Sequence, residues 1–343
     1  MTRVALVTRI PLEGPRQGDR NRLLGLYEAA SRLFDEVEVI VIGADSRLKP
    51  MRTESSSLYL RRKHGLWSGE SFDGVIAFQL GAAPSALSIP APWRVLDLTD
   101  SLDWYRQGLG RRPAVWVKRA TLWRVGQDEV RWGSQFDAAW VSAKPDADWL
   151  RRLGLKSHVV PNGTVEKKAL PAAEPRQLLM VGNLAYLPNH LGLTEFLANV
   201  WPHLHQKGYR LTLVGKGSGR KDWPTGVRGQ GFQAHLEPLY EIHGVAISPV
   251  KLGAGSQSKI FEAMGFSRPV VAHREGIPGL PERVRAAVLA VDDSPLSWLS
   301  ALESLGEPNR YREATDAGFA AVPRFSDNFH EALLQFLKGA PSA

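Results

Sequence analysis

The chain has 343 residues, of which 43% are hydrophobic and 23% are charged, a composition typical of globular rather than disordered proteins. It contains no cysteine, which excludes disulfide bonds and thiolate metal sites. The formal net charge is +8, and most of the excess lies in residues 1–165. Anionic lipid, nucleic acid and acidic substrates are therefore open alternatives to simple solubility.

The first half of the chain alternates short apolar runs with amphipathic stretches. Runs of apolar and β-branched residues predict strands buried on both faces, as in a parallel sheet, and the alternation predicts βαβ units. The predicted strands cover residues 4–8, 37–42, 74–78, 94–98 and 138–141, with a helix over 23–34. We expect neither a signal peptide nor a membrane span, because no apolar run approaches roughly 20 residues.

The pattern pauses over residues 161–176, where Pro-Asn-Gly and two further prolines predict a turn and a linker. It restarts with predicted strands over 178–181, 210–214, 244–248, 269–272 and 287–291, and with helices over 189–206 and 256–266. The predicted fold class is α/β, with two Rossmann-like domains, 1–163 and 164–343, facing across a cleft. The final helix, over 325–338, can pack back onto the first domain.

The sequence Gly-Ala-Gly-Ser-Gln-Ser-Lys over residues 253–259 leads into a predicted helix. Gly253 and Gly255 let the backbone approach a ligand, and the free N–H groups of the helix start favour an anion. Lys259 adds a cation for the same phosphate. Glu262 lies on the same helix face, where its carboxylate can accept two ribose hydroxyl hydrogen bonds. The alternative is an ordinary glycine loop with a solvated Lys-Glu pair.

This stretch, with Arg-Pro-Val-Val-Ala over 268–272, resembles the retaining, family-four glycosyltransferases of the two-Rossmann-domain (GT-B) class, also called glycosyltransferase group 1. Further stretches resemble the family in the expected order: 159–163, 179–183, Pro188-Asn189, Trp201-Pro202 and 211–217. Residues 9–11, 18–22 and 96–101 resemble a bacterial subgroup of sugar transferases found in exopolysaccharide clusters. The resemblance implies transfer of a sugar from a UDP- or GDP-linked donor with retention of configuration.

The chain also departs from that family. Ala254 stands where many members have the first of two glutamates, a residue commonly placed near the donor sugar. Asn183 stands where many members have an arginine, and Thr99 with Asp100 fills the region of a histidine. Lys216 and Lys259 are the candidate substitutes that would neutralise the phosphates.

Together, these observations define two sets of candidate site residues. The donor-binding set is Gly182, Asn183, Lys216, Phe232, Gly253, Gly255, Ser256, Gln257, Ser258, Lys259 and Glu262. The acceptor-binding set is Gly18, Asp19, Asp97 and Asp100, with Gly14 shaping the same loop. Asp100 and Lys259 are the candidate catalytic residues. We expect no metal and no other cofactor, because cations and helix amides can stabilise the leaving diphosphate.

Two short motifs have alternative interpretations. Gly-Lys-Gly-Ser-Gly over 215–219 follows a predicted strand, but it has neither the spacing of a nicotinamide-binding loop nor the order of a P-loop. A phosphate-facing loop is favoured. Asp146-Ala-Asp148 matches a metal-binding DxD motif, but it opens a predicted helix, where aspartates satisfy first-turn amides.

Residues 104–132 combine four tryptophans with a large excess of Lys and Arg over Asp and Glu. They could form an interfacial surface for an anionic membrane, or a helix that packs its tryptophans inward with its basic residues solvated. A second basic segment, over 47–63, is predicted to be a loop and raises the same question.

The sequence therefore predicts a glycosyltransferase of hexosyltransferase type acting on a glycan, lipid-linked or small-molecule acceptor. We expect no nucleic-acid partner. We expect a cytoplasmic location, with peripheral contact to the inner face of the membrane left open. The alternatives are a non-catalytic nucleotide-sugar-binding protein, and a sugar-nucleotide epimerase or nicotinamide enzyme on a related fold.

Overall fold

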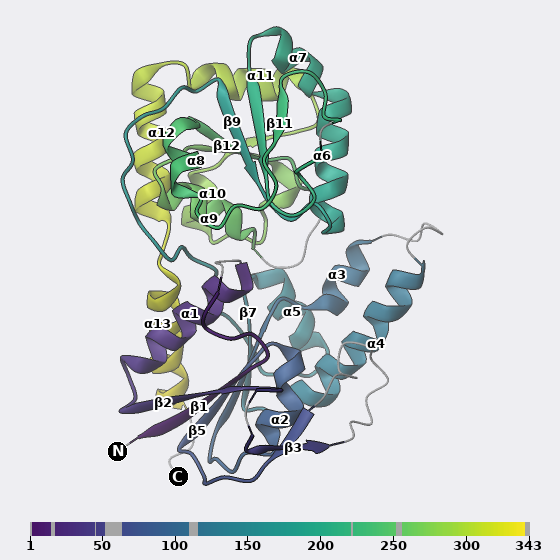
Figure 1. Cartoon of the computed structure of the whole chain (residues 1–343), viewed down its shortest axis with the longest axis vertical. Coiled ribbons are helices and arrows are strands. Elements are labelled where there is room, and N and C mark those ends of the chain that lie inside the picture. Colours follow the sequence, from purple (N-terminus) through teal and green to yellow (C-terminus); the bar gives the residue numbers. More distant parts are fainter. Residues whose placement is uncertain are drawn as a thin grey trace. The chain divides into compact units, whose positions relative to one another are not determined.

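The computed structural model describes residues 2–14, 18–44, 46–51, 64–109, 116–220, 222–251 and 256–339. Its contacts divide the chain into two units (Figure 1). The first consists of Met1–Pro161 with Phe325–Ala343, and the second is Asn162–Arg324. The division falls two residues before the boundary placed from the sequence, and the last helix belongs to the first unit.

The first unit is built on a six-stranded parallel sheet with strand order β2-β1-β5-β6-β7-β8. Its strands are β1 (Arg3–Thr8), β2 (Glu36–Val41), β5 (Gly74–Phe78), β6 (Arg94–Thr99), β7 (Ala138–Val141) and β8 (Ser157–Val159). Its helices are α1 (Gly18–Ser31), η1 (Leu80–Ala82), α2 (Ala83–Leu87), α3 (Leu102–Gly108), α4 (Trp116–Gly133), α5 (Lys144–Arg152) and α13 (Phe325–Gly339). Helix α13, from the last part of the chain, packs against α1, from the first part, and the two helices lie side by side in the first unit (Figure 1).

The second unit repeats this architecture with strand order β11-β10-β9-β12-β13-β14, again all parallel. Its strands are β9 (Gln177–Val181), β10 (Arg210–Val214), β11 (Val227–Gly229), β12 (Val245–Ser248), β13 (Val270–His273) and β14 (Leu289–Val291). Its helices are α6 (Leu187–Asn199), α7 (Trp201–Gln206), α8 (Glu237–Ile242), α9 (Ser258–Gly265), η3 (Arg274–Gly276), α10 (Glu282–Ala286), α11 (Pro295–Ser304) and α12 (Pro308–Ala321).

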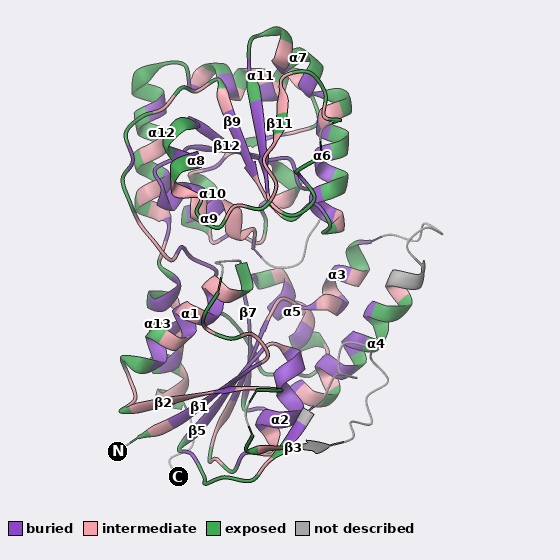
Figure 2. Cartoon of the chain, viewed as in Figure 1, coloured by how far each residue is buried: buried purple, intermediate pink, exposed green. Residues whose placement is uncertain are grey.

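Alternate strand residues of the second sheet enter two separate cores. Leu178 and Ile247 join a cluster with side chains of α6, α7 and α11, whereas Leu179 and Ala246 join one with side chains of α8, α9 and α10. Because successive side chains of a strand point to opposite faces, a sheet covered on both faces reads as a continuous apolar run. Figure 2 shows that the central strands of each unit are largely buried, whereas the outer helix surfaces are exposed.

The structure corrects three expectations about the elements. The helix expected over 189–206 is two helices, α6 and α7, because Pro202 lacks a backbone N–H and its ring crowds the carbonyl group four residues earlier. The basic segment over 47–63, expected as a loop, contributes to an antiparallel hairpin of β3 (Leu48–Met51) and β4 (His64–Trp67); residues 52–63 lie outside the described residues. Strands β8 and β11 were not predicted, since three residues are too few to show a period.

Candidate functional site

The strand order of the second unit predicts where a ligand would bind at its sheet. Counted along the chain from β9, the order is the 3-2-1-4-5-6 arrangement of dinucleotide-binding sheets, in which the winding direction reverses between the first and fourth strands. Those strands are β9 and β12. Ligands of such sheets bind beyond the carboxyl ends of the strands at this reversal, so Gly182, which follows β9, and Ser248, which ends β12, mark the expected place.

Two glycines, Gly182 and Gly215, allow the backbone segments that follow β9 and β10 to approach each other closely. Gly215, which follows β10, has a φ of +126°, and a Cβ atom there would lie 2.2 Å from the carbonyl oxygen of Gly182. The Gly182 amide in turn donates a hydrogen bond to the carbonyl oxygen of Val214 (2.8 Å). A Cβ atom on Gly182 would lie 3.0 Å from Nδ2 of Asn189 and 3.4 Å from Nζ of Lys259. The candidate donor residue Gly182 therefore leaves room for a lysine above the strand end.

Lys259 occupies that position from the second residue of α9. Its Nζ atom donates a hydrogen bond to Oδ1 of Asn189 (2.6 Å), and Nδ2 of Asn189 donates to the carbonyl oxygen of Asn183 (2.9 Å). The buried side-chain amide of Asn189 therefore bridges Lys259 and the backbone of Asn183. Burial lowers the pKa of Lys259 to about 7, because the charged form is desolvated. The sequence did not single out Asn189 as a site residue, although Pro188-Asn189 was part of the family resemblance.

The start of α9 is fixed by hydrogen bonds to the rest of the second unit. The side chain of Gln257 accepts a short hydrogen bond from Ser248 and donates one to the carbonyl oxygen of Gly276 (2.6 Å). The carbonyl oxygen of Ser256 accepts from Nδ2 of Asn162 (2.9 Å). Gln257 was a donor-binding candidate, but both ends of its amide bind protein groups, so its role here is to hold the helix start. Gly253 and Gly255 lie outside the described residues.

Lys251 anchors the chain on the other side of residues 252–255. Its ammonium group pairs with Glu195 of α6 (2.8 Å) and, through a shorter contact, with Asp293. Asp293 also lies 3.3 Å from Nε2 of the buried His273. The segment that joins Lys251 to Gln257 therefore starts and ends at residues fixed by ion pairs or hydrogen bonds.

The other donor candidates differ in exposure. Ser258, the first residue of α9, and Glu262, one turn along from Lys259, are half-buried. Asn183 and Lys216 are exposed, and the side-chain oxygen of Asn183 accepts a hydrogen bond from the amide of Ala185 (2.9 Å). Phe232 is 48% exposed, so its aromatic side chain is partly accessible to a ligand.

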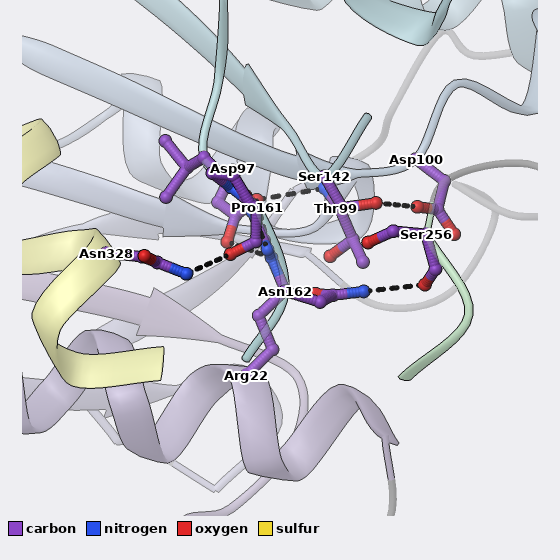
Figure 3. A network of polar contacts seen from close by, with 10 residues as sticks. Arg22, Asp97, Thr99, Asp100, Ser142, Pro161, Asn162, Ser256 and Asn328 are labelled. Atoms are coloured by element: carbon purple, nitrogen blue, oxygen red, sulfur yellow. Dashed lines mark hydrogen bonds and ion pairs between the residues drawn. The ribbon is translucent and has the colours of Figure 1, made fainter. Parts of the chain in front are cut away.

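In the first unit, Asp100 lies directly after β6 and beside a strained residue. Thr99 has a φ of +69°, unusual for a β-branched residue and a mark of backbone held by its surroundings. Oδ1 of the half-buried Asp100 accepts a hydrogen bond from the Ser142 hydroxyl (2.8 Å; Figure 3). Burial raises the pKa of Asp100 to about 6. The Ser142 hydrogen bond and the positive charge of Arg22 oppose this rise, whereas the negative charges of Asp19 and Asp97 add to it. The exposed Asp19, in the first turn of α1, is thus electrostatically linked to Asp100, and Gly18 begins the same helix.

Asp97 has a different role from the one expected. Its carboxylate is fully buried and binds the guanidinium of Arg22, with Nε–Oδ2 at 2.9 Å and Nη2–Oδ1 at 3.0 Å. Its Oδ1 atom also accepts a hydrogen bond from the Thr99 amide (2.9 Å; Figure 3). Arg22 in turn donates to the carbonyl oxygen of Val160 (3.0 Å). Asp97 therefore has no surface for an acceptor, and it fixes the strained turn that carries Asp100.

Two further buried carboxylates hold the residues after Asp100, and the sequence analysis missed both roles. Asp146 lies in the first turn of α5, as expected, and its Oδ1 atom also accepts a hydrogen bond from the amide of Ser101, the residue before α3 (2.8 Å). Glu129 of α4 accepts from the Ser101 hydroxyl (2.9 Å) and the Leu102 amide (2.6 Å). Burial raises the pKa of Glu129 to about 8. Charged residues inside an amphipathic helix gave no signal for this contact in the sequence.

The four tryptophans of residues 104–132 do not share one environment. Trp104 packs against Trp149 with ring centroids 5.7 Å apart, Trp132 is half-buried, and Trp123 is 52% exposed beside the exposed Arg124. The side chain of Trp116 lies outside the described residues, as do Arg111, Arg112 and the Lys118 side chain. None of the helices in the described ranges combines the length and apolarity of a membrane span.

Comparison with known proteins places this geometry in context. Residues 175–307 match the family model described as glycosyl transferases group 1. No curated protein sequence matches the chain. Among solved structures, sucrose-phosphate synthase from Thermosynechococcus elongatus is similar over 98% of both chains, with a TM-score of 0.68 and 16% identity. Anabaena HepE, solved with UDP and glucose, covers 99% of this chain and 100% of its own, with a TM-score of 0.62 and 14% identity.

WaaG, described as a glycosyltransferase involved in lipopolysaccharide biosynthesis, is similar over 99% of this chain and 100% of its own, with a TM-score of 0.61 and 12% identity. These chains share the architecture of two Rossmann-like units over their whole length. The predicted fold class is thus confirmed. The chain has the GT-B fold, and residues 175–307 of its second unit match the model of the glycosyl transferases group 1 family.

Proposed function

We propose that the protein is a glycosyltransferase that moves a sugar from a nucleoside diphosphate donor to a hydroxyl group of an acceptor. The observation that carries this proposal is the position of Lys259, which is held over the carboxyl end of β9 by Asn189 inside the segment that matches the family. A cation near the point where the winding direction of the sheet reverses suits a leaving diphosphate, because negative charge develops on the diphosphate as the sugar departs.

The second unit is the donor-binding unit in this proposal. Lys259 receives a phosphate, the first-turn amides of α9 and the adjoining backbone add hydrogen bonds, and Glu262 accepts the ribose hydroxyls. Phe232 offers a stacking surface for the base. The donor is UDP- or GDP-linked, and the reaction needs no metal ion. Turnover in excess EDTA tests the last point, and restoration of lost activity by added Mn²⁺ would contradict it.

The first unit binds the acceptor in this proposal. Asp100 is suited to bind or deprotonate an acceptor hydroxyl, because its pKa of about 6 leaves it ionised at neutral pH while close enough to that pH to take a proton. We propose retention of the anomeric configuration, on the family resemblance. NMR of the product formed from a donor of known configuration tests this.

A glycan or a lipid-linked glycan is the proposed acceptor class. Exposed Trp123 and Arg124 on α4 support weak peripheral contact of the first unit with an anionic membrane, where an indole ring lies at the headgroup level. The alternatives, a non-catalytic binding protein or an epimerase, are separated by a product assay. A transferase releases the nucleoside diphosphate and forms a glycosidic bond, a binding protein does neither, and an epimerase returns an altered nucleotide sugar.

A further inference from the structure

The Lys259 ammonium has no charged partner in the part of the chain that the structure describes. Its hydrogen-bond partner is the neutral amide oxygen of Asn189, and no carboxylate lies within ion-pair distance. The side chain lines a small cavity with Leu179, Val181, Ser248 and Tyr240, none of which carries charge at neutral pH. Within α9 itself, Glu262 is the other ionisable residue, one turn further along.

This arrangement is costly for the charged form of the lysine. A desolvated ammonium without a countercharge loses its proton more readily, which is why the pKa of Lys259 falls to about 7. At about pH 8 the side chain is therefore mostly neutral in the ligand-free protein. A phosphate oxygen beside Nζ reverses the balance, because an adjacent negative charge raises the pKa of a lysine.

We infer that the donor diphosphate binds together with one proton, which Lys259 takes up as the phosphate becomes its countercharge. The inference rests on the proposed function and deepens it, since it assigns the diphosphate to Lys259 instead of the exposed, solvated Lys216. The step is balanced: an N–H bond forms at Nζ, the buffer acid supplies the proton, and no bond of the donor breaks. Release of the diphosphate returns the proton.

Proton uptake gives the donor affinity a definite pH dependence. Below about pH 7 Lys259 is already charged in the free protein, so affinity is constant with respect to this group. Above that pH, affinity falls by about tenfold per pH unit until the pKa of the complex is reached. The two phosphates of a nucleotide sugar lack the ionisation near pH 6 of a terminal phosphate, so they do not titrate in this window.

The experiment is calorimetric titration of UDP-hexoses and GDP-hexoses into the full chain at about pH 8. Each titration is repeated in buffers of different ionisation enthalpy, so that the slope of the measured heat against that enthalpy counts the protons taken up. The wild type is expected to take up about one proton. Lys207→Arg, at an exposed lysine of the same unit, is the matched control and is expected to behave identically.

Two variants assign the proton. Lys259→Arg carries a permanent charge and is expected to bind without proton uptake and without the fall in affinity above pH 7. Asn189→Asp places a carboxylate beside Lys259, so the lysine is charged before the donor arrives; uptake is lost and affinity falls at least about tenfold through repulsion of the phosphate.

The outcomes separate the inference from the proposed function. Binding without proton uptake by the wild type, or uptake that persists in both variants, overturns the inference and leaves the proposed function standing. If no UDP- or GDP-hexose binds at any pH, the proposed function fails and the inference fails with it.

Discussion

The hydroxyl of Ser142 donates a hydrogen bond of 2.8 Å to Oδ1 of Asp100 across the ends of two neighbouring strands, β7 and β6. The contact stabilises the ionised carboxylate of Asp100, whose pKa burial raises to about 6. The buried Asp97–Arg22 pair holds the strained backbone at Thr99, which directly precedes Asp100. Asp100 is therefore a preorganised group with a pKa close to neutral pH.

Replacement of Asp100 by Asn is expected to lower kcat by about 10²- to 10⁴-fold, the usual contribution of a general base. Donor affinity, measured by calorimetry, should not change, because the proposed donor-binding residues lie in the other unit. A kcat within twofold of the wild type would remove Asp100 from the chemistry.

The pH profile gives a second, independent check on the same residue. Because the carboxylate form is the active one, kcat should fall as the pH drops below about 6. Ser142→Ala removes a hydrogen bond that lowers the pKa of Asp100, so the acid limb should move to higher pH. An acid limb that stays in place in this variant contradicts the assignment.

Glu262→Ala is expected to weaken the binding of nucleotide sugars by about 1.5–3 kcal/mol, since hydrogen bonds to a charged acceptor are lost. Glu262→Gln keeps the size of the side chain and should lose less. Circular dichroism serves as the control for folding. Unchanged affinity in Glu262→Ala would show that this carboxylate does not contact the ribose.

Glu129 makes the stability of the first unit pH-dependent. Burial raises its pKa from the ordinary glutamate value of 4.5 to about 8 on folding, so the folded state holds more protons between these pH values. Its stabilising contribution is complete below about pH 4.5 and is lost as the pH rises through about 8.

The midpoint of denaturant unfolding should therefore fall more between about pH 5 and about pH 8 in the wild type than in Glu129→Gln, which cannot ionise. Glu28→Gln, at an exposed glutamate of α1, serves as the control and should keep the wild-type slope. The same slope in Glu129→Gln and the wild type would mean that Glu129 ionises normally.

The proposed membrane contact predicts flotation of the protein with anionic vesicles at low salt. Each basic residue near such a surface contributes about 1 kcal/mol, screened beyond the Debye length, so binding should fall steeply as salt is added. Replacement of Trp123 and Arg124 by Ser should reduce flotation, while Lys156→Ser, at an exposed site elsewhere in the unit, should not. Wild-type protein that stays at the bottom of the gradient contradicts membrane contact.

The strands of the two sheets could be predicted from the sequence, because a strand buried on both faces forms a continuous run of apolar residues. Residues 74–78, 138–141 and 210–214 were expected as strands with the bounds that the structure has. The edge strands β8 and β11 have only three residues each and contain no continuous run of apolar residues. The break between α6 and α7 depends on Pro202 alone. The apolar residues on both sides of it keep a helical spacing, so the spacing predicts one continuous helix.

The candidate site was only partly predictable, because hydrogen bonds between distant residues leave no local pattern. Lys259 and Asp100 were singled out from motifs, and the structure gives each a fixed partner, Asn189 and Ser142. Asp97 resembles Asp100 in the sequence, yet it is buried against Arg22, 75 residues away. Burial and pairing decide which of two neighbouring carboxylates can meet a ligand, and both are properties of the folded chain.

The central claim is sugar transfer, and one measurement tests it most directly. The full chain is incubated with UDP- and GDP-hexoses and a glycan or lipid-linked glycan fraction, and mass spectrometry follows nucleotide and acceptor together. The account predicts that release of the nucleoside diphosphate is matched by acceptor molecules heavier by one hexosyl unit, and that Lys259→Met abolishes both. Release of diphosphate with free sugar alone, or conversion of the donor into another nucleotide sugar, would contradict it.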